Sequence, residues 1–218
     1  KIESDIDAKR ISSKRLIDEY EEGDRWVIIG EDQSGKTSLL KKYIQVLRGK
    51  GFYPIYIKDP MELLLGNIST RINKVFNEQY DCELEISQLP NNRIIAIIDD
   101  FHKCKNKKKV LGQILQVRGC IIVVDDIYTI DAQNDILADF ARYQITQLKP
   151  SQRNELIRKW LLASESTSDR RSINNEDLKR IDEASAMIEE SLGRVLGKGI
   201  MPSYAFFIIT LLIVQDDN

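Results

Sequence analysis

The distribution of apolar residues along the chain predicts strands and helices in alternation over the first two thirds of the sequence. Short apolar runs bounded by turn residues are typical of strands that a parallel sheet buries on both faces. Such runs occupy residues 25–29, 52–58, 93–100, 119–126 and 142–148. Apolar residues recur at helical spacing over residues 38–47, 61–80, 108–117 and 130–140. This alternation predicts an α/β fold with a five-stranded, mainly parallel sheet flanked by helices.

After Pro150 the pattern becomes helical throughout. Helices are expected over residues 151–162, 175–192 and 202–214. Ser151 and Asn175 suit helix N-caps, and Pro202 suits a first helical turn. Residues 1–22 show the spacing of one or two amphipathic helices. We therefore expect three parts, which are an N-terminal helical linker (1–24), an α/β core (25–149) and a small helical lid (150–218).

Composition and charge narrow the functional classes. The 218 residues are 42% hydrophobic and 30% charged, with a net charge of −2, so no global field favours nucleic acid or an anionic membrane. The three cysteines form no C-x-x-C pair, which argues against a zinc site and fits reduced cytoplasmic thiols. The most apolar segment, 205–214, is too short to span a bilayer as a helix. We expect a cytoplasmic protein without membrane contact. Because the chain begins at Lys1 rather than Met, we also expect it to be a piece of a longer protein.

Residues 30–37 read G-E-D-Q-S-G-K-T, which matches the phosphate-binding P-loop G-x-x-x-x-G-K-T. A predicted strand precedes this segment and a predicted helix follows it. In such a loop, backbone N–H groups surround the phosphates, the lysine reaches the β- and γ-phosphates, and the threonine hydroxyl holds Mg²⁺. The predicted nucleotide-binding residues of this segment are Gly30, Gln33, Ser34, Gly35, Lys36, Thr37 and Ser38.

A P-loop needs an acidic partner to complete the magnesium site, and two predicted strands end in acidic pairs. These pairs are Asp99-Asp100 and Asp125-Asp126. The magnesium carboxylate of P-loop enzymes is expected on a strand that neighbours the P-loop strand. The first pair is favoured because its strand comes earlier and follows a complete βα unit.

The favoured pair completes the predicted catalytic and metal sites. Asp99 holds Mg²⁺ together with Thr37, and Asp100 is the general base for the attacking water. Lys36, Asp99 and Asp100 are the predicted catalytic residues. The pair at 125–126 would then lie near the γ-phosphate, where it places negative charge.

Nucleotide specificity follows from motifs that the sequence lacks. No N-K-x-D or T-K-x-D segment follows a late strand, which argues against a GTPase. No L-S-G-G-Q segment is present either, which excludes a transporter-type ATPase. ATP and ADP, with Mg²⁺, are the expected ligands.

The whole arrangement resembles the STAND class of P-loop NTPases, a branch of the AAA+-related ATPases that includes the NACHT and NB-ARC families. The P-loop, the I-I-D-D strand, Leu148-Lys149-Pro150 and the helical lid carry the resemblance. Residues 151–162 are similar to the first lid helix of prokaryotic members. Gly199-Ile200-Met201-Pro202 is similar to the G-x-P element, which implies that Pro202 contacts the adenine end of the nucleotide.

The resemblance implies a slow, regulatory ATPase of prokaryotic signal transduction or defence. In this class ADP keeps the parent protein closed and ATP opens it for homo-oligomerisation. Its partners are the sensor and effector domains of the parent chain. Two features depart from the class, because Asp125-Asp126 stands where NACHT and NB-ARC proteins commonly place an arginine, and the G-x-P spacing is one residue longer.

Two other functions remain open at this point. A DNA-associated AAA+ ATPase would use a basic surface, and lysines are dense over residues 103–109, although the net charge argues against nucleic acid. A P-loop small-molecule kinase would use an arginine-rich lid, for which Arg170-Arg171 is available, but the long helical lid fits that function poorly.

Overall fold

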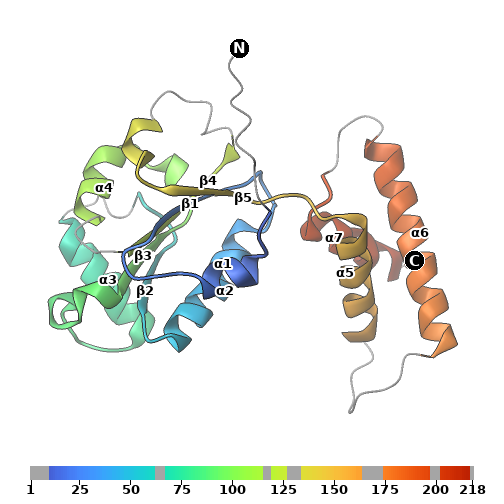
Figure 1. Cartoon of the computed structure of the whole chain (residues 1–218), viewed down its shortest axis with the longest axis horizontal. Helices are drawn as coiled ribbons and strands as arrows, with labels where there is room; N and C mark the ends of the chain where they lie inside the picture. Colours follow the sequence, from blue (N-terminus) through green and yellow to red (C-terminus); the bar gives the residue numbers. More distant parts are fainter. Residues whose placement is uncertain are drawn as a thin grey trace. The chain divides into compact units, whose positions relative to one another are not determined.

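The computed structural model describes residues 10–61, 67–114, 119–126, 134–163, 174–196 and 202–216. The chain divides into two compact units (Figure 1). The first consists of Lys1–Glu31 and Lys36–Gln144, and the second of Asp32–Gly35 and Ile145–Asn218. The second unit resumes at Ile145, and its first helix begins at Pro150.

The first unit is built on a five-stranded sheet in which every pairing is parallel. The strand order is β2-β3-β4-β1-β5, so β4 lies between β1 and β3. The strands are β1 (Arg25–Ile29), β2 (Tyr53–Ile57), β3 (Ile94–Ile98), β4 (Gly119–Val124) and β5 (Ala141–Gln144). The predicted α/β fold with a five-stranded sheet is confirmed.

Helices pack against this sheet, and the alternation of side chains along β1 shows how they divide between its faces. Val27 belongs to a buried cluster with Phe76 and Val110. Its neighbour Trp26 points to the opposite face, where its ring lies 6.5 Å from that of Tyr43. The helices of this unit are α1 (Ser13–Asp18), α2 (Lys36–Gly49), α3 (Ile68–Tyr80) and α4 (Lys107–Ile114). The first face is therefore covered by α3 and α4, and the second by α2.

The strands in the middle of the sheet are buried and the strand at the β5 edge is not. Every residue of β3 and of β4 is buried. In β5 three of the four residues are exposed, and the strand ends at Gln144 although the apolar pattern predicted it to continue to residue 148. An edge strand tolerates a polar sequence because one of its sides faces no other strand.

Some predicted helices are shorter in the structure or extend beyond the described residues. The helix predicted over 61–80 is described from Ile68, and the one predicted over 108–117 ends its described part at Ile114. Within the helix predicted over 130–140, the structure describes a 3₁₀ turn at Asn134–Leu137. Residues 62–66, 115–118 and 127–133 lie outside the described residues.

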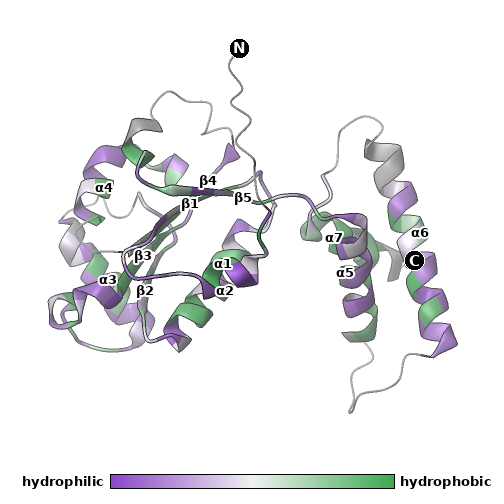
Figure 2. Cartoon of the chain, in the orientation of Figure 1, coloured by the Kyte–Doolittle hydropathy of each residue, from purple (hydrophilic) through white to green (hydrophobic). Residues whose placement is uncertain are grey.

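The second unit contains α5 (Pro150–Ala163), α6 (Asn175–Leu196) and α7 (Ala205–Asp216). Their buried core consists of Ile157, Ala184, Ile188, Ile208 and Leu212. Hydrophobic and hydrophilic residues alternate along α6, as expected of a helix that buries one face (Figure 2). No described helix is both long and apolar enough to cross a membrane.

The helix ends of this unit correct three details of the sequence interpretation. The N-cap of α6 is Asn174 rather than Asn175, since Asn174 Oδ1 accepts from the Asp177 N–H (2.8 Å) and Asp177 Oδ2 accepts from the Asn174 N–H (3.0 Å). Pro150, not Ser151, begins α5. Pro202 precedes α7, which starts at Ala205.

The tight packing of β4 against Tyr20 yields a stability prediction. A Cβ added at Gly119 would lie 2.4 Å from the hydroxyl oxygen of Tyr20 and 3.2 Å from Cγ1 of Ile95. Gly119→Ala should therefore lower the free energy of unfolding by about 1–3 kcal/mol, because overpacking forces side chains to move. Urea denaturation at equilibrium measures this loss.

A second substitution tests the cause. Tyr20→Phe removes the hydroxyl that meets the new methyl group, so the double variant should lose less stability than the sum of the two single losses. Additive losses would show that Tyr20 does not limit the space at Gly119.

Candidate functional site

The P-loop connects β1 to α2 and has the backbone geometry of an anion-binding loop. Gln33 and Gly35 both have positive φ angles, 58° and 95°. The space where a Cβ of Gly35 would stand is open. The helix α2 begins at Lys36, so its first N–H groups are not used within the helix and face the loop.

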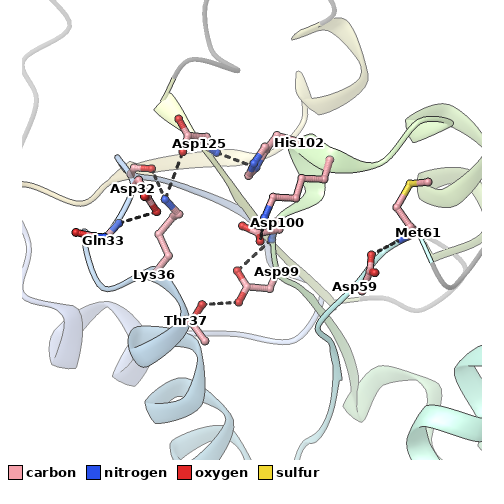
Figure 3. Close-up of polar contacts among 12 residues, drawn as sticks. Asp32, Gln33, Lys36, Thr37, Asp59, Met61, Asp99, Asp100, His102 and Asp125 are labelled. Carbon is pink, nitrogen blue, oxygen red and sulfur yellow. Dashed lines mark hydrogen bonds and ion pairs between the residues drawn. The ribbon is translucent and has the colours of Figure 1, made fainter. Parts of the chain in front are cut away.

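Lys36 is held inside this loop. Its side chain is 9% exposed, and its ammonium donates to the carbonyl oxygens of Gly30 (2.7 Å) and Glu31 (2.6 Å). The same ammonium lies 3.6 Å from Oδ2 of Asp125 (Figure 3). The positive charge of Lys36 therefore sits at the centre of the loop and is partnered within the protein.

Thr37 faces the acidic residue that follows β3. Its hydroxyl donates to Oδ2 of Asp99 at 2.7 Å, and Figure 3 shows the two side chains directed toward each other. Asp99 is 4% exposed. The Tyr56 hydroxyl donates to the same oxygen (3.0 Å), and the backbone N–H of Asp100 donates to Oδ1 (3.0 Å). Burial, together with the neighbouring Asp99 carboxylate, raises the pKa of Tyr56, so this residue stays a donor at neutral pH.

Asp100 begins a turn that leads away from the sheet. Its backbone is left-handed (φ 49°, ψ 35°), which is uncommon for a residue other than glycine. Its carboxylate binds the ammonium of Lys103 and is about one third exposed. Asp100, the predicted general base, thus follows Asp99 directly in the chain and forms an ion pair with Lys103.

The second acidic pair approaches the P-loop from a different strand. Asp125 follows β4, and its backbone N–H donates to Nδ1 of His102 (3.2 Å). The pairing of Ile29 with Val124 places the ends of β1 and β4 side by side. From the sequence, the strand of Asp99 was expected beside the P-loop strand. The structure instead has β4 there, and one residue of each acidic pair reaches the P-loop, Asp99 at Thr37 and Asp125 at Lys36.

The residues present fit a nucleotide with a hard divalent cation. Among the described residues, the Ser34 hydroxyl is buried and has no hydrogen-bond partner, so an anion in the loop would satisfy it. Thr37 and Asp99 offer oxygen ligands, which Mg²⁺ prefers. Gly30 is buried at the end of β1, and Ser38 lies exposed in the first turn of α2. No group of three or more His, Cys, Asp or Glu with metal-binding geometry occurs among the described residues.

Pro202 belongs to the second unit, in the segment before α7 that Arg153 holds. Arg153 is buried, and it donates to the Leu148 carbonyl (3.2 Å) and to Oγ of Ser203 (3.3 Å). Its Nε also donates to Oε1 of Glu189 (2.9 Å). The role of Pro202 at the adenine stays a prediction.

Sequence reasoning missed two contacts of the site. The first is the hydrogen bond from the Tyr56 hydroxyl to Asp99. Tyr56 lies one residue before the end of β2, and only the pairing of β2 with β3 brings it close to Asp99. The second missed contact is that of His102 with the backbone of Asp125, which lies 23 residues further along the chain. A tyrosine at the carboxyl end of a predicted parallel strand was the available signal for Tyr56.

The position of His102 gives a pH dependence. Burial is the largest effect on the pKa of His102 and lowers it. The carboxylates of Asp100 and Asp125 raise this pKa by less. The ammonium groups of Lys103 and Lys36 lower it, as burial does. Because the folded pKa is depressed, the unfolded chain binds more protons below the ordinary histidine pKa of about 6.5. The contribution of neutral His102 to stability is therefore complete above this pH and is lost as the pH falls toward the folded pKa.

We expect wild type to lose more stability than His102→Asn between about pH 7.5 and about pH 5.5. Asparagine supplies an acceptor oxygen for the Asp125 N–H and does not titrate. Because His102 is the only histidine, this variant removes all histidine titration from the chain. Urea midpoints at several pH values measure the effect, and equal losses in both proteins would contradict it.

Comparisons with known proteins identify no family. No family model matches the chain, and no curated protein matches it. Similar solved structures include AMPPCP-bound DnaA from Aquifex aeolicus, with 17% identity and a TM-score of 0.49 over 86% of this chain and 59% of that one. Hsp104 with ATPγS and FITC casein has 16% identity and a TM-score of 0.47 over 71% of this chain and 30% of that one.

PCH-2 of C. elegans is also similar, with 14% identity and a TM-score of 0.46 over 80% of this chain and 54% of that one. The chain spans less than two thirds of the length of each of these three solved chains. These similarities concern the fold alone, and the residues of the site carry the evidence for function.

Proposed function

We propose that this chain is an ATP- and ADP-binding NTPase module with regulatory, slow hydrolysis. The observation that carries the proposal is the hydrogen bond between Thr37 and Asp99. It joins the residue after the P-loop lysine to the acidic end of a buried parallel strand. This is the pairing that a P-loop needs to hold a nucleotide and its cation.

Each residue has a defined part in this proposal. The backbone N–H groups of the loop and the first turn of α2 bind the phosphates, and Lys36 neutralises their charge. Thr37 and Asp99 hold Mg²⁺, which when bound offsets the negative charge that develops on the phosphates. Tyr56 orients the Asp99 carboxylate through its hydrogen bond. Asp100 accepts the proton of the attacking water.

The contacts of Asp100 support slow turnover. Oδ2 of its carboxylate binds the Lys103 ammonium, so in this arrangement only the other oxygen is available to the attacking water. A general base that forms an ion pair before the nucleotide binds is expected in a module that signals through which nucleotide is bound and not through its rate of hydrolysis. Within this proposal the chain belongs to a larger cytoplasmic signalling or defence protein of the STAND class, whose sensor and effector domains are its partners.

The proposed function makes a prediction about nucleotide binding. Lys36→Ala should weaken ADP and ATP binding by about a hundredfold or more, because a buried ammonium in contact with phosphate contributes strongly to affinity. Calorimetric titration with each nucleotide in the presence of Mg²⁺ measures the loss.

A second lysine provides a matched control. The Lys50 ammonium donates to the carbonyls of Ile17 (2.8 Å) and Asp18 (2.6 Å), just as Lys36 donates to two carbonyls. Lys50→Ala should leave both affinities within about threefold of wild type. Unchanged affinity in Lys36→Ala would remove the P-loop from the proposal.

The next prediction separates binding from hydrolysis. Asp100→Asn should keep ADP affinity within about threefold of wild type and lower turnover about a hundredfold, because an amide cannot act as a general base. Phosphate release under saturating ATP measures turnover. Asp126→Asn is the comparison variant, and loss of turnover there instead would move the base to the other acidic pair.

The same turnover assay tests the DNA-associated alternative. Stimulation of wild-type ATP turnover by single- or double-stranded DNA would favour a DNA-associated ATPase. Turnover that is independent of DNA is expected for the regulatory module.

A further inference from the structure

The carboxylate of Asp125 occupies a position that the proposed function leaves unexplained. It follows β4, the strand beside the P-loop strand, and lies 3.6 Å from the ammonium of Lys36. The loop carbonyls of Gly30 and Glu31 accept the hydrogen bonds of the same ammonium. The one positive charge known to lie in the loop therefore already faces a negative charge from the protein.

Solvent screens this pair only partly. The side chains of Lys36 and Asp125 are 9% and 21% exposed. Ion pairs that are partly buried are screened by salt much less than pairs on the surface. A second anion that approaches Lys36 therefore experiences more of the negative charge of Asp125 than it would at an exposed site.

We propose that Asp125 is a specificity-determining residue, which makes this site favour a nucleoside diphosphate over the triphosphate. The inference rests on the proposed function, since it requires a nucleotide in the P-loop. A P-loop lysine contacts the β- and γ-phosphates, so the triphosphate brings one more charged group toward Lys36 than the diphosphate does. The Asp125 carboxylate repels the phosphates of a bound nucleotide and so lowers its affinity. The γ-phosphate, which only the triphosphate has, experiences the larger part of this repulsion.

The backbone of Asp125 is fixed independently of its charge. Its N–H donates to Nδ1 of His102, at 3.2 Å. A substitution that changes only the carboxylate keeps this hydrogen bond, because the bond uses the main chain. Asp125→Asn therefore removes the charge and leaves the anchoring of the β4 end in place.

The test measures the dissociation constants of ADP and of AMPPCP, which is not hydrolysed, by calorimetry on the whole chain with Mg²⁺. Wild type should bind ADP more tightly than AMPPCP. Asp125→Asn should tighten AMPPCP binding about tenfold and ADP binding by no more than about threefold, so the ratio of the two constants moves toward unity. Asp125→Glu keeps the charge and should keep a ratio close to that of wild type.

An exposed ion pair of similar length gives the matched control. Glu78 lies 3.5 Å from the Lys74 ammonium on α3, and Glu78→Gln removes one carboxylate from a lysine pair, as Asp125→Asn does. In Glu78→Gln, the ratio of the ADP and AMPPCP dissociation constants should equal that of wild type. A shift of the same size in Glu78→Gln would overturn the inference, because the effect would then come from net charge.

The remaining outcomes separate the inference from the function on which it rests. An unchanged ratio in Asp125→Asn, with both nucleotides still bound, overturns the inference and leaves the proposed function intact. Wild type that prefers AMPPCP also overturns it, and this criterion holds even where Asp125→Asn does not fold. Wild type that binds neither nucleotide overturns the proposed function itself.

Discussion

The carboxylate of Asp99 is the constraint on which the site depends. It is 4% exposed, and a buried charge destabilises a protein strongly unless donors surround it. Three donors meet it from three places in the chain, the hydroxyl of Thr37 in α2, the hydroxyl of Tyr56 in β2 and the N–H of Asp100. Satisfying this one carboxylate therefore fixes the first turn of α2 against the ends of two strands. The position of the P-loop follows from that attachment.

Three charged side chains around the loop already have partners within the protein. Lys36 faces Asp125, Asp100 binds Lys103, and Asp99 accepts from neutral donors. A nucleotide that enters such a site exchanges some of these partners, and it also supplies a partner for the Ser34 hydroxyl. Because each exchange gives up an existing interaction, the free energy of binding is sensitive to small differences in ligand charge. Under the proposed function, such a site would serve discrimination between nucleotides better than rapid turnover.

The accuracy of sequence interpretation followed the range of the interactions involved. Residues 25–29 were predicted as a strand with the bounds that β1 has, because a short apolar run between turn residues is typical of a buried strand. The strand predicted over 142–148 ends at Gln144, since the apolar pattern does not show where pairing with β1 stops. The cap of α6 was placed one residue late because two asparagines stand in succession, and only the bonds with Asp177 distinguish them.

The local part of the site could be predicted for the same reason. The P-loop is contiguous, so its spacing alone indicated where the turn lies, which lysine faces it and which hydroxyl follows. The sheet order is not local, and nothing in the residues shows that β4 inserts between β1 and β3. That insertion brings Asp125 to Lys36 while Asp99 reaches Thr37, and it gives the two similar acidic pairs different partners. The sequence determined that a P-loop and two acidic strand ends exist. The tertiary structure decided which carboxylate meets which charge, because electrostatic interactions depend on distance in space and not on separation along the chain.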